Sequence, residues 1–174
     1  MKKLSFLFVY LMFIVLSCKK NASHANTASA NDAISLSVNS VTEVFNTNAA
    51  ATQLNASGTY SLTINGTGYQ PQDTDQITIV IKSNTPITTG TYSVATTPPQ
   101  QASLIYTTNS SKREWSNDTA NGSYQPQVTI TSISNTNVQG TFSGNLILFK
   151  SFPAGIGNAT TNITNGKFNV AIKQ

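Results

Sequence analysis

The stretch that decides the fold runs from Gln127 to Gly144 and reads QVTITSISNTNVQGTFSG. On each side of its centre, hydrophobic side chains alternate with polar or small ones, and this period of two predicts a β-strand with one buried face. The centre, Ser134 to Asn137, consists of small polar residues that favour a turn. We therefore expect two neighbouring antiparallel strands joined by a tight hairpin.

The same alternation recurs through the rest of the chain, and it predicts about eight or nine strands in all. Its hydrophobic positions begin at Ile34, Tyr60, Ile77, Tyr92, Leu104, Val128, Val138 and Phe168. Residues 49–54 alone have a composition that suits one short helical turn. Without a helix to cross over a sheet, neighbouring strands must pair antiparallel.

A second hairpin is predicted at Asn165-Gly166, because Asn-Gly favours a two-residue type I′ turn. That turn would bring Ile163 and Phe168 onto one face. The pattern as a whole predicts an all-β fold, and the uneven lengths of strands and loops favour an antiparallel β-sandwich. A small β-barrel is the alternative.

The first residues have the features of an export signal, with two lysines, an apolar run from Leu4 to Leu16, and then the only cysteine, Cys18. The run is shorter than the roughly 20 residues that span a bilayer. Residues 15–18 (VLSC) resemble a bacterial lipobox, in which the cysteine thiol receives a diacylglycerol. We therefore expect a lipoprotein signal peptide at 1–17, lipidated Cys18 and a flexible tether at 18–31, and an all-β domain at 32–174.

The formal charge of +4 and the pI near 9.3 come mostly from lysines near the N-terminus. From Asp32 onward, six basic residues balance six acidic ones. A nucleic-acid-binding protein needs a basic surface that displaces counterions, so this class is excluded. Charged residues make up 9% of the chain, against about 25% in typical domains, and Thr, Ser and Asn take their place.

Few residues offer catalytic chemistry. The single histidine, His24, lies in the predicted tether, where no rigid scaffold orients it as a base. The sequence contains no Gly-x-Ser-x-Gly nucleophile motif and no pair of His or Cys ligands for zinc. We predict no enzyme activity, no cofactor and no metal site. Two carboxylate pairs that suit ordinary turns leave hydrolysis as a remote alternative: Asp73 with Asp75, and Glu114 with Asp118.

Trp115, the only tryptophan, follows the charged residues Lys112-Arg113-Glu114. An exposed indole on a polar β-surface would stack on a sugar ring or anchor a protein partner. In the alternative interpretation, Trp115 closes an open end of the hydrophobic core. Trp115 is therefore the candidate ligand contact, with this structural role as its alternative.

The export signal and Cys18-Lys19-Lys20, followed by a small Thr- and Asn-rich β-domain, resemble the small lipoproteins of Bacteroidetes. Residues 128–131 (VTIT), 139–144 (QGTFSG) and 163–168 (ITNGKF) are similar to uncharacterised all-β families of those lipoproteins. These families carry no activity to transfer. The resemblance implies the outer membrane, on its periplasmic face because no acidic residue follows Cys18, with the cell surface as the alternative. It also implies O-glycosylation of Thr119, within Asp118-Thr119-Ala120.

Together these observations predict a lipid-anchored, non-catalytic binding or accessory module of the bacterial cell envelope. Its expected partners are the membrane, through Cys18, and a carbohydrate or protein ligand. The alternative is an envelope-structural or assembly lipoprotein that has no small ligand.

Overall fold

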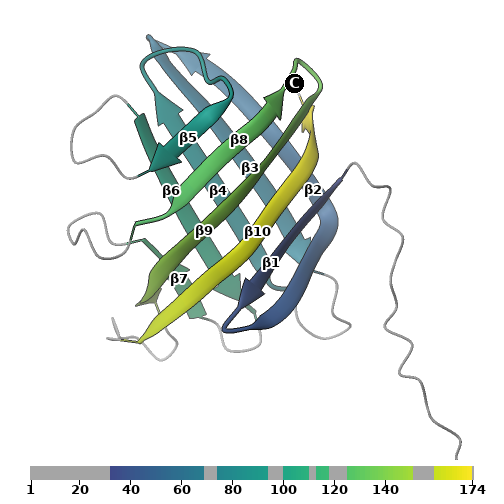
Figure 1. Ribbon diagram of the computed structural model, residues 1–174, viewed down its shortest axis with the longest axis vertical. Helices are drawn as coiled ribbons and strands as arrows, with labels where there is room; N and C mark the ends of the chain where they lie inside the picture. The colour runs from purple at the N-terminus through teal and green to yellow at the C-terminus, as the bar shows by residue number, and fades with distance from the viewer. Residues whose placement is uncertain are drawn as a thin grey trace, which may run out of the picture.

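A computed structural model describes residues 32–68, 74–93, 100–109, 113–117, 125–150 and 159–173. Within these ranges the chain forms ten β-strands that belong to one sheet (Figure 1). Their bounds are β1 Ala33–Val38, β2 Val41–Ala56, β3 Thr59–Gly68, β4 Gln76–Ser83, β5 Gly90–Ser93, β6 Gln100–Thr108, β7 Arg113–Ser116, β8 Gln127–Ile133, β9 Asn137–Lys150 and β10 Thr160–Lys173. The all-β prediction is therefore confirmed, but the expected number of about eight or nine strands is too low, because β2 and β7 were not identified from the sequence.

Eight of these strands close into an antiparallel barrel. They follow one another around the wall in the order β1, β2, β3, β4, β6, β7, β9 and β10, and β10 pairs again with β1. The β-sandwich prediction is wrong and the barrel alternative is correct. Alternating hydrophobic residues suit both architectures, whereas closure depends on the pairing of the first strand with the last.

The two remaining strands, β5 and β8, complete the upper part of the wall in Figure 1. One edge of β9 pairs with β8 along Val138–Ser143 and then with β7 along Ile147–Lys150. β5 in turn pairs with the other edge of β8. Between β9 and β6, the wall is therefore formed by β7 at one end of the barrel and by β8 and β5 at the other.

The barrel has two distinct ends, which we name by the chain segments found there. At the entry end, β1 begins at Ala33 and β10 finishes at Lys173 (Figure 1, top). At the far end, β1 turns into β2 through Asn39 and Ser40, whose positive φ values of 48° and 73° suit a two-residue hairpin turn. Strands β3 and β6 also finish at the far end.

Asn165-Gly166 forms a bulge inside β10 and not the predicted hairpin. The register of β10 against β9 shifts between Ile163 and Gly166, and Asn165 has a φ of 53°. Ile163 and Phe168 are five positions apart, so a regular strand would place them on opposite faces. The extra residue keeps both inside, at 0% and 3% exposure. A hairpin would satisfy the same hydrophobic pattern, which is why the sequence did not distinguish the two.

Two other local predictions have opposite outcomes. The hairpin at Ser134 to Asn137 is confirmed, because Ile133 pairs with Val138 and Ser134 Oγ accepts the Asn137 N–H at 3.1 Å. The helical turn at 49–54 is wrong, because these residues belong to β2. A bulge with Asn48 at φ 54° interrupts the regular alternation just before them.

Aromatic rings fill the barrel beside glycines on the neighbouring strand. Phe168 pairs with Gly140, and Phe142 pairs with Gly166. A Cβ atom on Gly140 would collide with Cζ of Phe168, and one on Gly166 would lie 2.7 Å from both Cδ atoms of Phe142. The interior is thus packed by side chains, as an eight-stranded barrel permits.

Candidate functional site

Several residues singled out in the sequence lie outside the described part of the chain. These are the predicted signal and tether at 1–31 with Cys18, and also Asp73, Asp118 and Thr119. Lipidation and glycosylation therefore stay predictions. Asp75 lies just before β4, and Glu114 and Trp115 lie in β7, so one member of each predicted carboxylate pair is placed.

Trp115 is a core residue at the far end of the barrel. Its side chain is 9% exposed, and its strand neighbours are Tyr106 on β6 and Leu148 on β9. This environment agrees with the alternative in which the indole closes an end of the core. Contact with a ligand stays a prediction.

Beside Trp115, Tyr106 joins two carboxylates that lie far apart in the sequence. Its hydroxyl oxygen lies 3.0 Å from both carboxylate oxygens of Glu43 and 2.9 Å from Oδ2 of Asp75. The backbone N–H of Asn109 donates to the second oxygen of Asp75 at 3.0 Å. The cluster of Glu43, Tyr106 and Asp75 therefore ties together β2, the start of β4 and the end of β6.

The cluster has fewer donor protons than carboxylate oxygens that could accept them. A tyrosine hydroxyl carries one proton and donates it to one carboxylate at a time. Burial raises the pKa of Glu43; the hydrogen bond from Tyr106 opposes this rise, and the negative charge of Asp75 adds to it. Burial also raises the pKa of Tyr106, as do the two neighbouring carboxylates. Tyr106 therefore stays a neutral donor, and the geometry suits a structural tie better than a nucleophile or a base.

The sequence analysis missed Glu43. Its signal is the alternation of Val41, Glu43 and Phe45, in which the carboxylate occupies an inward position opposite the buried Leu36 of β1. Sequence alone offered no partner for it, because Tyr106 is 63 residues away along the chain. Only closure of the barrel brings the two side chains together.

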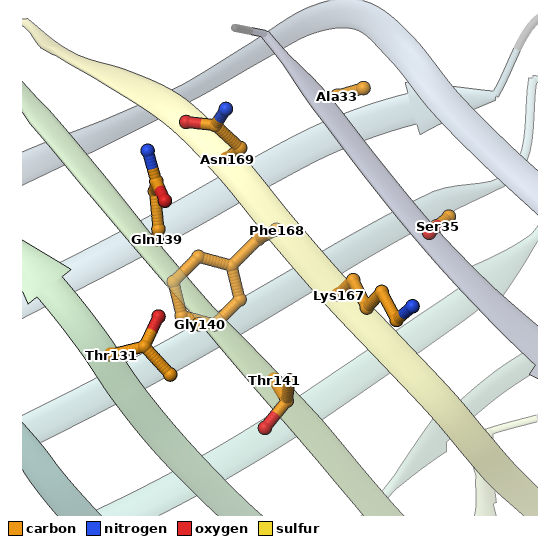
Figure 2. A pocket seen from close by; sticks show the side chains of 9 residues that line it. All are labelled: Ala33, Ser35, Thr131, Gln139, Gly140, Thr141, Lys167, Phe168 and Asn169. Atoms are coloured by element: carbon orange, nitrogen blue, oxygen red, sulfur yellow. The ribbon is translucent and has the colours of Figure 1, made fainter. Parts of the chain in front are cut away.

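The outer wall carries a shallow groove of about 320 Å³ that crosses β8, β9, β10 and β1 (Figure 2). Gln139, Thr141 and Lys167 are exposed on it, next to the buried neighbours Phe142 and Phe168. The complete lining is Ala33, Ser35, Thr131, Gln139, Gly140, Thr141, Lys167, Phe168 and Asn169. Amide and hydroxyl groups with a single ammonium, and no carboxylate, form a neutral to weakly basic polar surface.

A second groove, of about 280 Å³, lies at the entry end. It combines apolar and polar side chains, namely Gln53, Leu54, Asn55, Tyr60, Asn135, Ile172 and Lys173. Leu54 is 62% exposed, and Tyr60 is half-buried. The two grooves therefore differ in chemistry as well as in place.

Metal-binding groups and membrane-spanning helices are both absent from the described ranges. They contain no group of three or more His, Cys, Asp or Glu side chains that could hold a metal ion. They also contain no helix with the length and apolar character needed to cross a bilayer. Comparisons with models of protein families, with curated proteins and with solved structures found no match to this chain.

Proposed function

We propose that this protein is a lipid-anchored, non-catalytic binding or accessory module of the bacterial cell envelope. The observation that carries the proposal is the outer-wall groove of Figure 2, a polar surface on a barrel whose interior is already packed. A ligand would therefore bind outside the barrel. The amide of Gln139, the hydroxyl of Thr141 and the ammonium of Lys167 suit the hydroxyl groups of a carbohydrate, or polar groups of a protein partner.

The anchor in this proposal is Cys18, and its support is the sequence. Acyl chains contribute about 0.8 kcal/mol per buried CH₂, and stable anchoring needs more than one chain. A diacylglycerol on Cys18 would supply this, and we place the protein at the periplasmic face of the outer membrane. Substitution Cys18→Ala should release the protein from the membrane fraction, and continued partition with membranes would refute the anchor.

The binding proposal is tested on a glycan array with residues 32–174. The matched variants are Gln139→Ala, in the groove, and Gln101→Ala, on β6, where the glutamine is also exposed. If a glycan binds in the groove, Gln139→Ala should weaken it by about fivefold to tenfold, the effect of one lost hydrogen bond. The control Gln101→Ala should leave binding unchanged. Equal effects of both variants would place the ligand elsewhere.

An empty array, together with capture of one envelope protein from solubilised membranes, would favour the alternative of a structural or assembly lipoprotein. A capture that Gln139→Ala and Lys167→Ala both weaken would keep the groove as the binding surface and make the ligand a protein. A capture that neither variant weakens would remove the groove from the proposal.

A further inference from the structure

The chain enters the barrel at one defined end. Asp32, the first described residue, accepts the backbone N–H of Ala171 through Oδ1 at 2.9 Å. This bond fixes the start of β1 beside the last residues of β10 (Figure 1, top). An anchor located N-terminal to Asp32 would therefore be connected to the barrel at the entry end and not at the far end.

The β2–β3 hairpin reaches beyond the end of β10 at this same end. The last pairs between β10 and β2 join Ile172 to Ala51 and Lys173 to Thr52, so residues 53–56 of β2 continue past the end of β10. On its other side the hairpin stays paired with β4 as far as Tyr60 and Ser83. The turn of the hairpin is formed by Ser57 and Gly58, with φ values of 51° and 79°. The hairpin turn therefore lies on the rim of the entry end.

The side chains on this rim are those that favour a lipid–water interface. Leu54 is 62% exposed, and it lines the entry-end groove with Tyr60, Ile172 and Lys173. A leucine gains free energy when it enters the acyl boundary, a tyrosine favours the headgroup level, and a lysine extends its ammonium toward phosphates. The far end also exposes large hydrophobic side chains, Val41, Val44 and Phe149, but it carries three of the four described carboxylates, Glu43, Asp75 and Glu114. What distinguishes the entry end is therefore its lower content of carboxylates and the point where the chain enters.

The predicted tether is short compared with the barrel. Thirteen residues, 19–31, give a root-mean-square reach of about 20 Å. A 14-residue strand such as β10, tilted as barrel strands are, spans about 35 Å along the axis. An anchor at Cys18 would therefore hold the entry end close to the bilayer more readily than the far end.

We propose that the entry end of the barrel is a membrane-contacting surface, which rests on lipid headgroups with Leu54 at the boundary of the acyl chains. This proposal rests on the lipid anchor at Cys18 described above. The partner is a phospholipid surface, and the far end points away from it. The groove of Figure 2 then lies on the side wall, open to a ligand from the space beside the membrane.

The test uses the full-length lipoprotein, reconstituted into vesicles of phosphatidylethanolamine and phosphatidylglycerol that contain a headgroup-quenching lipid. A fluorophore is attached to a cysteine introduced by Leu54→Cys at the entry end or by Val41→Cys at the far end. The two positions are matched, because both residues are aliphatic and are 62% and 64% exposed. Acylation of Cys18 leaves the introduced cysteine as the single free thiol.

The label at position 54 should be quenched at least about threefold more strongly than the label at position 41. Equal quenching, or stronger quenching at position 41, in a protein that floats with the vesicles would overturn the membrane-contacting surface and leave the anchor intact. A protein that does not float and has the mass of an unmodified chain would refute the anchor and this surface together.

Discussion

The two ends of the barrel are built by the same strands but differ in the polar groups that they hold. The far end partly buries Glu43 and Asp75 and holds them with the hydroxyl of Tyr106. The entry end leaves Leu54 exposed on the β2–β3 hairpin, and the far end likewise exposes Val41 beside the β1–β2 turn. A carboxylate removed from water lowers the free energy of unfolding unless a donor binds it, whereas an exposed leucine has little effect on that free energy. The carboxylate cluster of the far end should therefore contribute to stability, whereas Leu54 should matter for association and not for stability.

The largest effect is expected in the wall that connects the two ends. Gly140→Ala places a methyl group against the ring of Phe168 and the backbone oxygen of Thr129. Relief requires movement of a buried ring or of the backbone, so we expect a loss of about 3 kcal/mol in the free energy of unfolding. Urea denaturation measures this loss. A loss below about 0.5 kcal/mol would show that the ring and the glycine are not in contact.

Tyr106→Phe should have the next largest effect, because it removes the only donor shared by Glu43 and Asp75 in the described chain. An unsatisfied buried polar group costs about 1–3 kcal/mol, and we expect a loss of about 2 kcal/mol. The matched control is Tyr60→Phe on the half-buried tyrosine of the entry end, which should lose less than about 0.5 kcal/mol. Similar losses from both variants would contradict the difference between the two ends.

The stability of the protein should depend on pH through Glu43 at the far end. The fold raises the pKa of Glu43 above its ordinary value of 4.5, so the folded protein binds this proton more tightly than the unfolded chain does. The resulting stabilisation is complete below about pH 4.5 and is lost as the pH rises through the folded-state pKa.

Glu43→Gln should remove this fall in the unfolding free energy, which thermal unfolding measured from pH 4 to pH 8 detects. Asp75→Asn, which removes a neighbouring negative charge, should make the fall smaller. If the unfolding free energy of the wild type and of Glu43→Gln had the same dependence on pH, the pKa of Glu43 would not be raised by folding.

The smallest effect on the folded state is expected at the entry end. Leu54→Ser removes an exposed side chain, so the free energy of unfolding should change by less than about 0.5 kcal/mol. The same substitution should weaken contact with phospholipid vesicles, which quenching of a label on Lys173→Cys would report. A large loss of stability would mean that Leu54 supports the barrel itself.

Much of the fold followed from the sequence by local rules. Alternation identified eight of the ten strands, all but β2 and β7, and the polar residues 134–137 identified one hairpin. Local rules failed at Asn165-Gly166 and at 49–54, where bulges with positive φ keep long strands continuous. At each of these places two local structures satisfy the same hydrophobic pattern. The pairing of β10 with β9 and of β2 with β3 decides between them.

The candidate sites were less accessible to sequence reasoning. Asp75 was identified only as part of a turn pair, and Glu43 was not identified at all, because their common partner Tyr106 comes from another strand. Trp115 was considered for an exposed surface on the basis of its charged neighbours, but the register of β7 places it among Tyr106 and Leu148. Successive side chains of a strand point to opposite faces, so the charged neighbour Glu114 does not show on which face Trp115 lies.

The sequence by itself determined that this chain forms strands with one hydrophobic face and a polar, nearly neutral surface, because alternation and composition are local properties. The tertiary structure alone decided that the strands close into a barrel, that Glu43 meets Asp75 through Tyr106, and that the chain enters at the end with Leu54. These features depend on pairing between residues as distant as Ile34 and Phe168. Such pairing is selected by the fit of the whole wall and not by any single segment.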